Sequence, residues 1–404
     1  MSSAIKSPFL CGHATHPEAR MALALVAAQL DAQRAQQPGF VPTLGLLYIT
    51  DAYAAQAEAL LADAQARWPA LSIVGTTGIG VCAGGVEYFD EPALVLMLAD
   101  LPREHFSVFN GMRALLDPQA WTALVHADPA LPELAELVGE LAERTGARYL
   151  FGGLASGRGR TPQFADGVFE GGLSGVAFHH EIGVISRVTQ GCQPVGPTHR
   201  VTAAERNVVL TLDHQPALKL LLADLGETGD IHQALSPQSV QKLRGTLVGL
   251  SDADDDARGR GGEFGADTRV RGLIGIDPAR EAIAVGDIAE PGMGLSFCSR
   301  HVAAARRDLV RICTEIREEV EADEAIAETA GHAAEATRRQ IAGAVYVSCT
   351  GRGGPHFGGP SAELQIVRQA LGDVPLAGFF AAGEIGRHHL YGYTGVLTVF
   401  LTSS

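Results

Sequence analysis

The chain has 404 residues, of which 46% are hydrophobic and 19% are charged, and it contains 48 glycines. This length predicts two domains or one large fused unit and excludes a single small module. The apolar content excludes wholesale disorder, no uninterrupted apolar run is long enough to predict a membrane-spanning helix, and a formal net charge of −15 argues against nucleic-acid and anionic-membrane surfaces.

Predicted elements in the first half alternate between helix and strand. In chain order we expect a helix over 17–37, a strand over 44–50, a helix over 54–68, a strand over 71–74, a glycine loop, a strand over 93–98 and a helical stretch over 118–144. From Tyr149 the pattern becomes mainly β. Strands are predicted over 168–178 and 183–190 and a hairpin over 199–212, before a helix over 213–225.

The second half opens with a charged, glycine-rich segment, residues 251–264, which predicts an exposed loop. Strands are then expected over 270–276, 281–286 and 294–298, and a long acidic helical region over 301–342, broken near Gly331. The end repeats the pattern of the first half, with a strand over 345–349, a glycine loop, a helix over 361–371 and strands over 376–380 and 395–401.

This repetition indicates an internal duplication. Placing Gly75 on Gly378 also places Gly80 on Gly383 and aligns the strands that follow without a gap. We therefore predict a mixed α/β fold with two related halves, whose mixed β-sheets are covered by helices, and a layered αββα-like arrangement fits this pattern. Two related halves commonly place a site between them.

A glycine loop directly after the strand over 345–349 is the first candidate site. Gly351 and Gly353 let backbone N–H groups approach a ligand, and Arg352 is suited to hold a carboxylate or phosphate. A tight turn with a solvent-facing arginine is the alternative. Cys349 is a candidate nucleophile if a histidine lies near it, although a small buried hydrophobe is its commoner role.

A carboxylate stands at the end of the strand over 376–380. Glu384 follows Gly383 and is suited to accept hydrogen bonds from an amine or hydroxyl, or to form a structural ion pair with Arg352. If it is buried it must have a partner. A third glycine loop offers Gly153 and Ser156 as ligand contacts, but it reads equally well as a flexible loop.

Metal and redox signals are weak. The six cysteines form no CxxC pair and no regular framework, so we expect neither a structural zinc site nor disulfides. Adjacent histidines on a strand point to opposite faces, which disfavours simple chelation at His179-His180 or His388-His389. Haem held by a single histidine stays open. The N-terminus carries no secretory pattern, so we expect a cytoplasmic protein.

Several motifs in their joint order resemble the FIST family of paired N- and C-terminal sensory domains. They are VGTTGIG at 74–80, FGGLASG at 151–157, the run at 188–202, VRGLIGIDPAREAIAVGD at 270–287, YVSCTGRG at 346–353, PLAGFFAAGEIG at 375–386 and YGYTGVLTVF at 391–400. The resemblance implies an N-terminal helical extension over 1–37, a FIST N-like domain over 38–244 and a FIST C-like domain over 245–404. Val81 departs from the Gly-Glu of the family's first-half motif.

The resemblance also implies a signalling protein that binds a small ligand, with amino acids among the ligands proposed for the family. Arg352 and Glu384 are complementary in charge to an amino acid, and we expect Tyr391 or Tyr393 to wall the pocket. The alternatives are a haem-dependent sensor of nitric oxide, an enzyme that uses Cys349 or Glu384 in a cleft, and a protein-interaction platform. Since no output segment is recognisable, we expect a separate signalling partner.

Overall fold

The structure is a computed structural model that describes residues 7–227, 237–252, 268–329 and 339–403. It divides into two compact units, of which the first comprises Met1–Thr189, Asp308–Leu390 and Thr394–Ser404 and the second Gln190–Arg307 and Tyr391–Tyr393. The second unit is therefore an insertion in the sequence of the first. None of the helices in the described part of the chain is long and apolar enough to cross a membrane.

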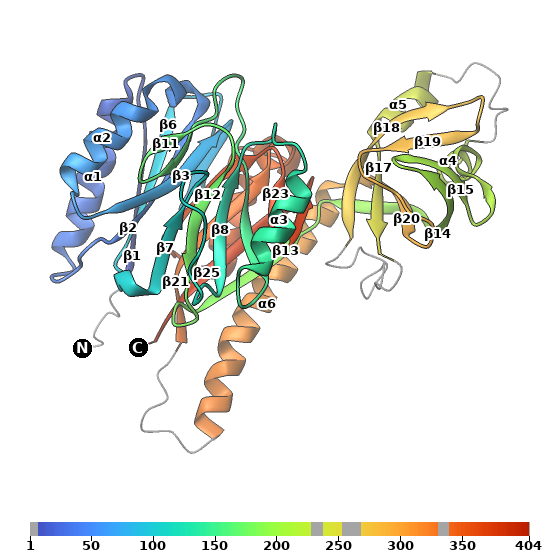
Figure 1. Ribbon diagram of the computed structural model, residues 1–404. Coiled ribbons are helices and arrows are strands. Elements are labelled where there is room, and N and C mark those ends of the chain that lie inside the picture. Colours follow the sequence, from blue (N-terminus) through green and yellow to red (C-terminus); the bar gives the residue numbers. More distant parts are fainter. Residues whose placement is uncertain (1–6, 228–236, 253–267, 330–338, 404) are drawn as a thin grey trace. The chain divides into compact units, whose positions relative to one another are not determined.

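The first unit is built from β-strands in three sheets (Figure 1). Its strands are β1 (Phe9–Thr15), β2 (Leu44–Thr50), β3 (Ser72–Gly78), β4 (Gly80–Ala83), β5 (Val86–Phe89), β6 (Ala93–Ala99), β7 (Phe106–Phe109), β8 (Thr122–Ala127), β9 (Tyr149–Leu154), β10 (Gln163–Ala165), β11 (Val168–Phe169), β12 (Leu173–Phe178), β13 (Val184–Thr189), β21 (Arg339–Cys349), β22 (Leu376–Ala381), β23 (Glu384–Arg387), β24 (His389–Tyr391) and β25 (Gly395–Ser403). The sheet orders are β1-β6-β2-β3-β10-β11, β24-β23-β9-β8-β12-β7 and β13-β25-β21-β22-β4-β5.

These three sheets share one arrangement. In each, two parallel strands lie at the centre, namely β2 and β3, β8 and β9, or β21 and β22. A returning strand, β6, β12 or β25, pairs antiparallel with the first of the two. An outer strand, β1, β7 or β13, then pairs antiparallel with the returning strand. The two-halves prediction therefore understates the regularity, because the same arrangement occurs a third time.

We name the three repeats of this arrangement lobes: the first covers residues 9–99, the second 106–178, and the third 184–189 with 339–403. Each lobe also carries a hairpin between its second parallel strand and its returning strand. That hairpin pairs with the sheet of another lobe. The hairpin β4-β5 of the first lobe joins β22, β10-β11 of the second lobe joins β3, and β23-β24 of the third lobe joins β9. This cyclic exchange ties the three lobes together.

Aromatic side chains from all three sheets fill the space between them. Tyr48 of β2 contacts both Phe379 of β22 and His126 of β8, with ring centroids 5.1 and 5.6 Å apart. Phe400 of β25 packs against Phe9 of β1 at 5.0 Å and against rings of the second sheet. Burial lowers the pKa of His126 to about 3, so this imidazole is a neutral part of the core.

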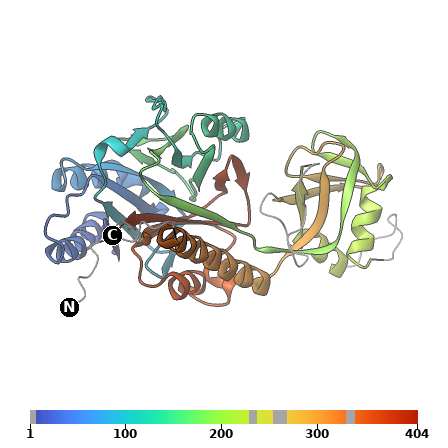
Figure 2. The ribbon, with the colours of Figure 1, turned by 90° about the horizontal axis from the view of Figure 1, so that it is seen from below.

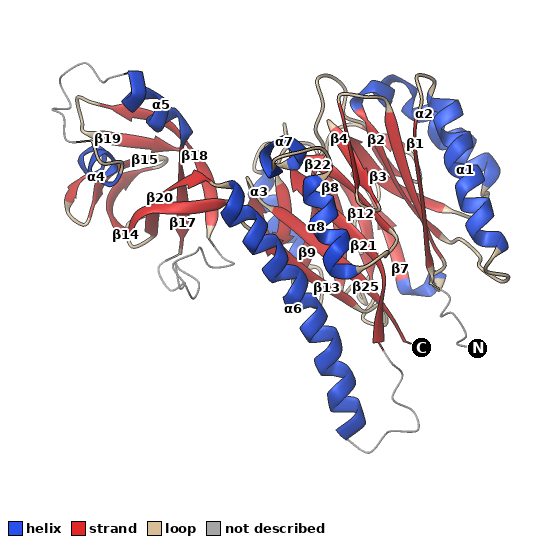
Figure 3. Ribbon diagram, turned by 180° about the vertical axis from the view of Figure 1, so that it is seen from behind, coloured by secondary structure: helices blue, strands red, loops and turns tan. Residues whose placement is uncertain are grey.

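Helices cover the outer faces of the sheets. They are α1 (Ala19–Ala35), α2 (Ala57–Arg67), α3 (Leu134–Glu143), α6 (Val302–Thr329), α7 (Gly353–Phe357) and α8 (Ala362–Leu371), with short 3₁₀ turns η1 (Asp51–Gln56) and η2 (Arg103–His105). Figure 2 shows α1 and α2 against the first sheet, where Leu23, Leu30 and Leu60 join its core. The helix α8 covers the third sheet (Figure 3). The mixed α/β class with helix-covered mixed sheets is confirmed.

The described residues of the second unit form one antiparallel sheet, two helices of its own and the start of α6. Its elements are β14 (Cys192–Glu205), β15 (Val208–Leu212), β16 (Gln215–Pro216), β17 (Thr246–Ser251), β18 (Arg269–Asp277), β19 (Ala282–Val285), β20 (Gly294–Arg300), α4 (Ala217–Asp224) and α5 (Pro237–Gly245). The order is β14-β20-β17-β18-β19-β15-β16, and a further pairing of β14 with β15 closes the sheet on itself. The predicted hairpin over 199–212 is confirmed, with Glu205 opposite Val208 across the turn.

Two predicted helical regions are wrong in part, and several strands of the structure were not predicted. The helical stretch over 118–144 begins with the strand β8, because all six residues of Thr122–Ala127 are buried at the centre of a sheet. The helical region over 301–342 ends in strand β21, whose first residue, Arg339, pairs with Ser403. Strand β1 was not predicted at all. From residue 253 onward, the predicted loop over 251–264 lies outside the described residues.

Candidate functional site

Arg352 lies in the turn that follows β21, as predicted, but it does not face solvent. Its backbone N–H donates to Cys349 O, which tightens the turn, and its side chain is 1% exposed. The guanidinium Nε donates to Glu363 Oε1 at 2.8 Å. A buried arginine requires such a partner, so the prediction of an arginine free to hold a ligand bidentately is corrected to one already held by a carboxylate.

Glu363 is the functional residue that sequence reasoning missed. It lies in the first turn of α8 and is fully buried, where it accepts hydrogen bonds from Tyr346 Oη at 2.6 Å, Ser348 Oγ at 3.0 Å and Gly353 N at 3.1 Å. An acidic residue in the first turn of a helix that follows a glycine loop was the available signal.

A second buried carboxylate supports that helix from another lobe. Glu87 of β5 accepts the backbone N–H groups of Glu363 and Leu364 at 3.1 and 3.0 Å. Burial raises the pKa of Glu87 to about 7, and the nearby charge of Glu363 adds to this. The exchanged hairpin β4-β5 thus supplies the cap of α8 and orders the residue that holds Arg352.

Glu384 begins β23 and is completely buried. Its Oε2 accepts hydrogen bonds from the Thr394 hydroxyl at 2.6 Å and from Thr394 N at 3.1 Å. Desolvation raises the pKa of Glu384 to about 8, against the opposing effects of Thr394, of the Arg352 charge and of a hydrogen bond from the Cys349 thiol.

Three polar atoms in this region have no hydrogen-bond partner within the described chain. They are Nη2 of Arg352, Oε1 of Glu384 and Oε2 of Glu87, all buried. The charge of Arg352 opposes the rise in the pKa of Glu384, but the two side chains form no ion pair among the described residues. Buried polar atoms without protein partners in native proteins bond to water or to a ligand.

The predicted glycine and serine contacts lie close to this group. Gly153 pairs with Glu384 across β9 and β23, and a Cβ on Gly153 would lie 2.9 Å from Gly383 O. The Ser156 hydroxyl accepts Ile79 N at 2.8 Å and donates to Phe380 O. Ser156 thus joins parts of three lobes and is not in a flexible loop.

The remaining predicted residues have more local roles. Gly353 has φ +67°, and a Cβ there would lie 2.6 Å from the Phe89 ring, so this position requires glycine. Gly351 is half-buried in the same turn. Tyr391 and Tyr393 belong to the second unit, where Tyr393 packs against Cys192, so their place in a pocket with Arg352 stays a prediction.

A cavity of about 570 Å³ opens at the ends of the parallel strands of the first unit. Thr350, one residue after β21, and Ala382, one residue after β22, line it together with Ser156 and Gly157. The remaining lining residues are Ile79, Asp128, Pro129, Ala130, Ala155, Gly159, Arg160, Thr161 and Glu170. Ligands in α/β proteins generally bind at the carboxyl ends of parallel strands, and this cavity lies there.

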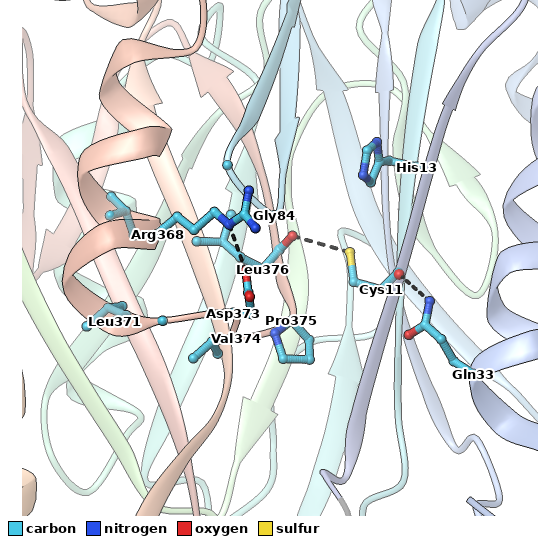
Figure 4. A pocket seen from close by; sticks show the side chains of 13 residues that line it. Cys11, His13, Gln33, Gly84, Arg368, Leu371, Asp373, Val374, Pro375 and Leu376 are labelled. Atoms are coloured by element: carbon cyan, nitrogen blue, oxygen red, sulfur yellow. Dashed lines mark hydrogen bonds and ion pairs between the residues drawn. The ribbon is translucent and has the colours of Figure 1, made fainter. Parts of the chain in front are cut away.

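A second cavity, of about 240 Å³, lies between β1 and the end of α8 (Figure 4). The Cys11 thiol donates to Leu376 O at 3.2 Å, and Arg368 pairs with Asp373 at 2.7 Å. Burial raises the pKa of Cys11 to about 12, which makes this thiol a poor nucleophile.

Haem does not fit this second cavity. His13 lines it, but the Nδ1 atom of His13 is hydrogen-bonded to the Tyr88 hydroxyl, and the space is smaller than the 300–1,000 Å³ usual for cofactor sites. In the described part of the chain, no three histidine, cysteine or acidic side chains gather as metal ligands.

Comparison with known proteins gives matches over most of the chain. Residues 43–215 match the FIST N domain and residues 217–387 match the FIST C domain. The uncharacterized protein Rv0628c of Mycobacterium tuberculosis is 32% identical, over 96% of this chain and 98% of that protein. The uncharacterized protein Mb0898c of Mycobacterium bovis is 31% identical over the same shares.

Proposed function

The chain belongs to the FIST family, whose domains are generally sensory, signal-transduction domains, and from this we propose that it is a cytoplasmic sensor of an amino acid or a similar small polar metabolite. Arg352 fixes an anionic group of the ligand, and Glu384 bonds a cationic or hydroxyl group. The ligand enters through the cavity that Thr350 and Ala382 line.

One observation carries this proposal. Arg352 and Glu384 are buried, the charge of Arg352 opposes the rise in the pKa of Glu384, and each side chain keeps one polar atom without a hydrogen-bond partner in the described chain. An unbonded buried donor or acceptor costs about 1–3 kcal/mol. A ligand that places an anionic group at Arg352 and a cationic or hydroxyl group at Glu384 satisfies both atoms and recovers that free energy.

Isothermal titration calorimetry with the twenty amino acids and small carboxylic acids tests the proposal. We expect a saturable signal for at least one, and an affinity at least tenfold lower in Glu384→Gln and in Arg352→Lys, because a single ammonium cannot both keep the contact with Glu363 and offer the ligand a second donor where Nη2 of Arg352 lies. Arg368→Lys is the matched control, since this arginine of α8 is 48% exposed and, among the described residues, forms its ion pair with exposed Asp373. Unchanged affinity in both site variants would show that the ligand binds elsewhere.

The output of the sensor passes through a separate partner protein in this proposal. The described units contain ligand-sized cavities but no recognised effector sequence, and the net charge of −15 disfavours nucleic acid as that partner. Cell fractionation with the tagged full chain tests the cytoplasmic location, and recovery in the membrane pellet would contradict it.

A further inference from the structure

The 570 Å³ cavity lies where the three lobes meet. Ile79, Ser156 and Ala382 all line it, and each stands four residues after a glycine that packs against the carbonyl of the neighbouring parallel strand. These glycines are Gly75, Gly152 and Gly378, whose register partners are Leu47, Val125 and Tyr346. Corresponding positions of three lobes thus form one cavity.

The side chains that line this cavity carry more negative than positive charge. Arg160 is its positive side chain, and it is already paired with two carboxylates, Glu170 and Glu58, the latter at 3.2 Å. Asp128 lies one residue after β8, at the end of a central strand. One oxygen of Asp128 accepts Ala130 N at 2.8 Å, and its carboxylate forms no ion pair with any residue in the described ranges.

This arrangement leaves one negative charge uncompensated inside a recess. A cavity of low dielectric concentrates the field of such a charge and raises the local concentration of cations. The buried Glu384, whose Oε1 has no hydrogen-bond partner in the part of the chain that the structure describes, lies two residues after the cavity residue Ala382. Because no three metal-ligating side chains gather in the described residues, the field favours an organic cation over a metal ion.

We propose that the cavity between the three lobes is an ammonium-binding site, in which Asp128 holds the primary amine of the ligand and the Thr350 hydroxyl lies beside it. The inference rests on the proposed function and narrows the ligand class to small molecules with a protonated amine. In this arrangement Glu384 bonds a hydroxyl or amide group of the same ligand, and Arg352 its anionic group.

The site can be tested without knowing the natural ligand. In an Ala382→Cys variant, we compare the labelling rates of a cationic and an anionic methanethiosulfonate reagent of similar size at neutral pH and low salt. We expect the cationic reagent to react about tenfold faster, corrected for intrinsic reactivity, and Asp128→Asn in the same background to reduce that ratio at least threefold. The unmodified chain is the blank, since five of its six cysteines are buried.

Asp373→Asn serves as the charge control, because Asp373 is 81% exposed and does not line this cavity, and we expect it to leave the ratio unchanged. Equal rates for the two reagents, or a ratio that Asp128→Asn does not reduce, would overturn the proposal. A retained preference with no amino-acid binding would instead remove the proposed function. In a final arm, amines without a carboxylate should slow labelling, whereas carboxylates without an amine should not.

Discussion

At the scale of single residues, the candidate site is built around three buried carboxyl groups, those of Glu87, Glu363 and Glu384. Sequence reasoning placed Glu384 at a strand end and required a partner for it, but named Arg352. The partners are Thr394 and Cys349, and Arg352 is held by Glu363. These contacts depend on which strand Glu384 joins and on the direction of the turn after Cys349, and neither follows from local sequence pattern.

Raised pKa values make stability fall as pH rises. The pKa of Glu384 is about 8 in the folded chain against an ordinary value of 4.5, so between these values the folded state binds a proton that the unfolded state has lost. This contribution to stability is complete below about pH 4.5 and is lost as pH rises through 8, with a slope of at most about 1.4 kcal/mol per pH unit.

We therefore expect urea denaturation of the unmodified chain to show decreasing stability from pH 7 to 8.5, and Glu384→Gln to flatten this decrease. The pKa of Glu87 is about 7, so its contribution to the pH dependence of stability lies mainly below pH 7. Glu87→Gln should therefore change the slope of unfolding free energy against pH between pH 5 and 7. Equal slopes in Glu384→Gln and in the unmodified chain would mean that Glu384 ionises normally.

At the scale of elements, the paired parallel strands approach each other closely at one glycine in each lobe, where no other residue would fit. A Cβ on Gly75, Gly152 or Gly378 would lie 1.7, 2.0 or 1.8 Å from the carbonyl oxygen of the paired strand. Sequence comparison identified Gly75 and Gly378 as equivalent, but not Gly152. The apolar segment Thr122–Ala127 was assigned to a helix, and this removed the strand β8 that pairs with Gly152.

Gly152→Ala should destabilise the chain by about 3 kcal/mol or more, because the methyl group meets backbone and no flexible side chain can give way. Gly139→Ala in α3 is the matched control, since nothing lies within 4 Å of its Cβ. Alanine is the better helix former there, so the control should gain up to about 1 kcal/mol. Chemical denaturation measures both, and a Gly152→Ala chain of unchanged stability would contradict the close approach.

At the scale of the whole molecule, the exchange of hairpins explains why the sequence shows only part of the plan. A lobe cannot complete its own sheet, because the strand next to β3, β9 or β22 comes from a different lobe. Pairings between residues about 90 to 300 positions apart leave no local signature. The sequence predicted the helix-covered sheets and the repeated glycine spacing. It did not predict the third lobe or the inserted unit, because both are defined by contacts between residues far apart in the chain.

The inserted unit begins and ends at neighbouring points of the first unit. Thr189 closes β13 and Asp308 lies in α6, and the Thr189 hydroxyl donates to Asp308 Oδ2 at 2.9 Å. Both residues are buried on the first unit, so their positions are fixed by its own packing. About four Gly and Ser residues reach across such a gap without strain.

Replacing residues 190–307 with that linker should leave a first unit that folds cooperatively, because its three sheets and their shared core draw strands from outside the excised segment. We expect a single unfolding transition and, in an Ala382→Cys version, the same preference for the cationic reagent as in the full chain, since every residue of the 570 Å³ cavity lies in the first unit. Loss of that preference in a cooperatively folded chain would show that the inserted unit shapes the cavity. A chain without a cooperative transition would show that the three lobes depend on the insertion for their stability.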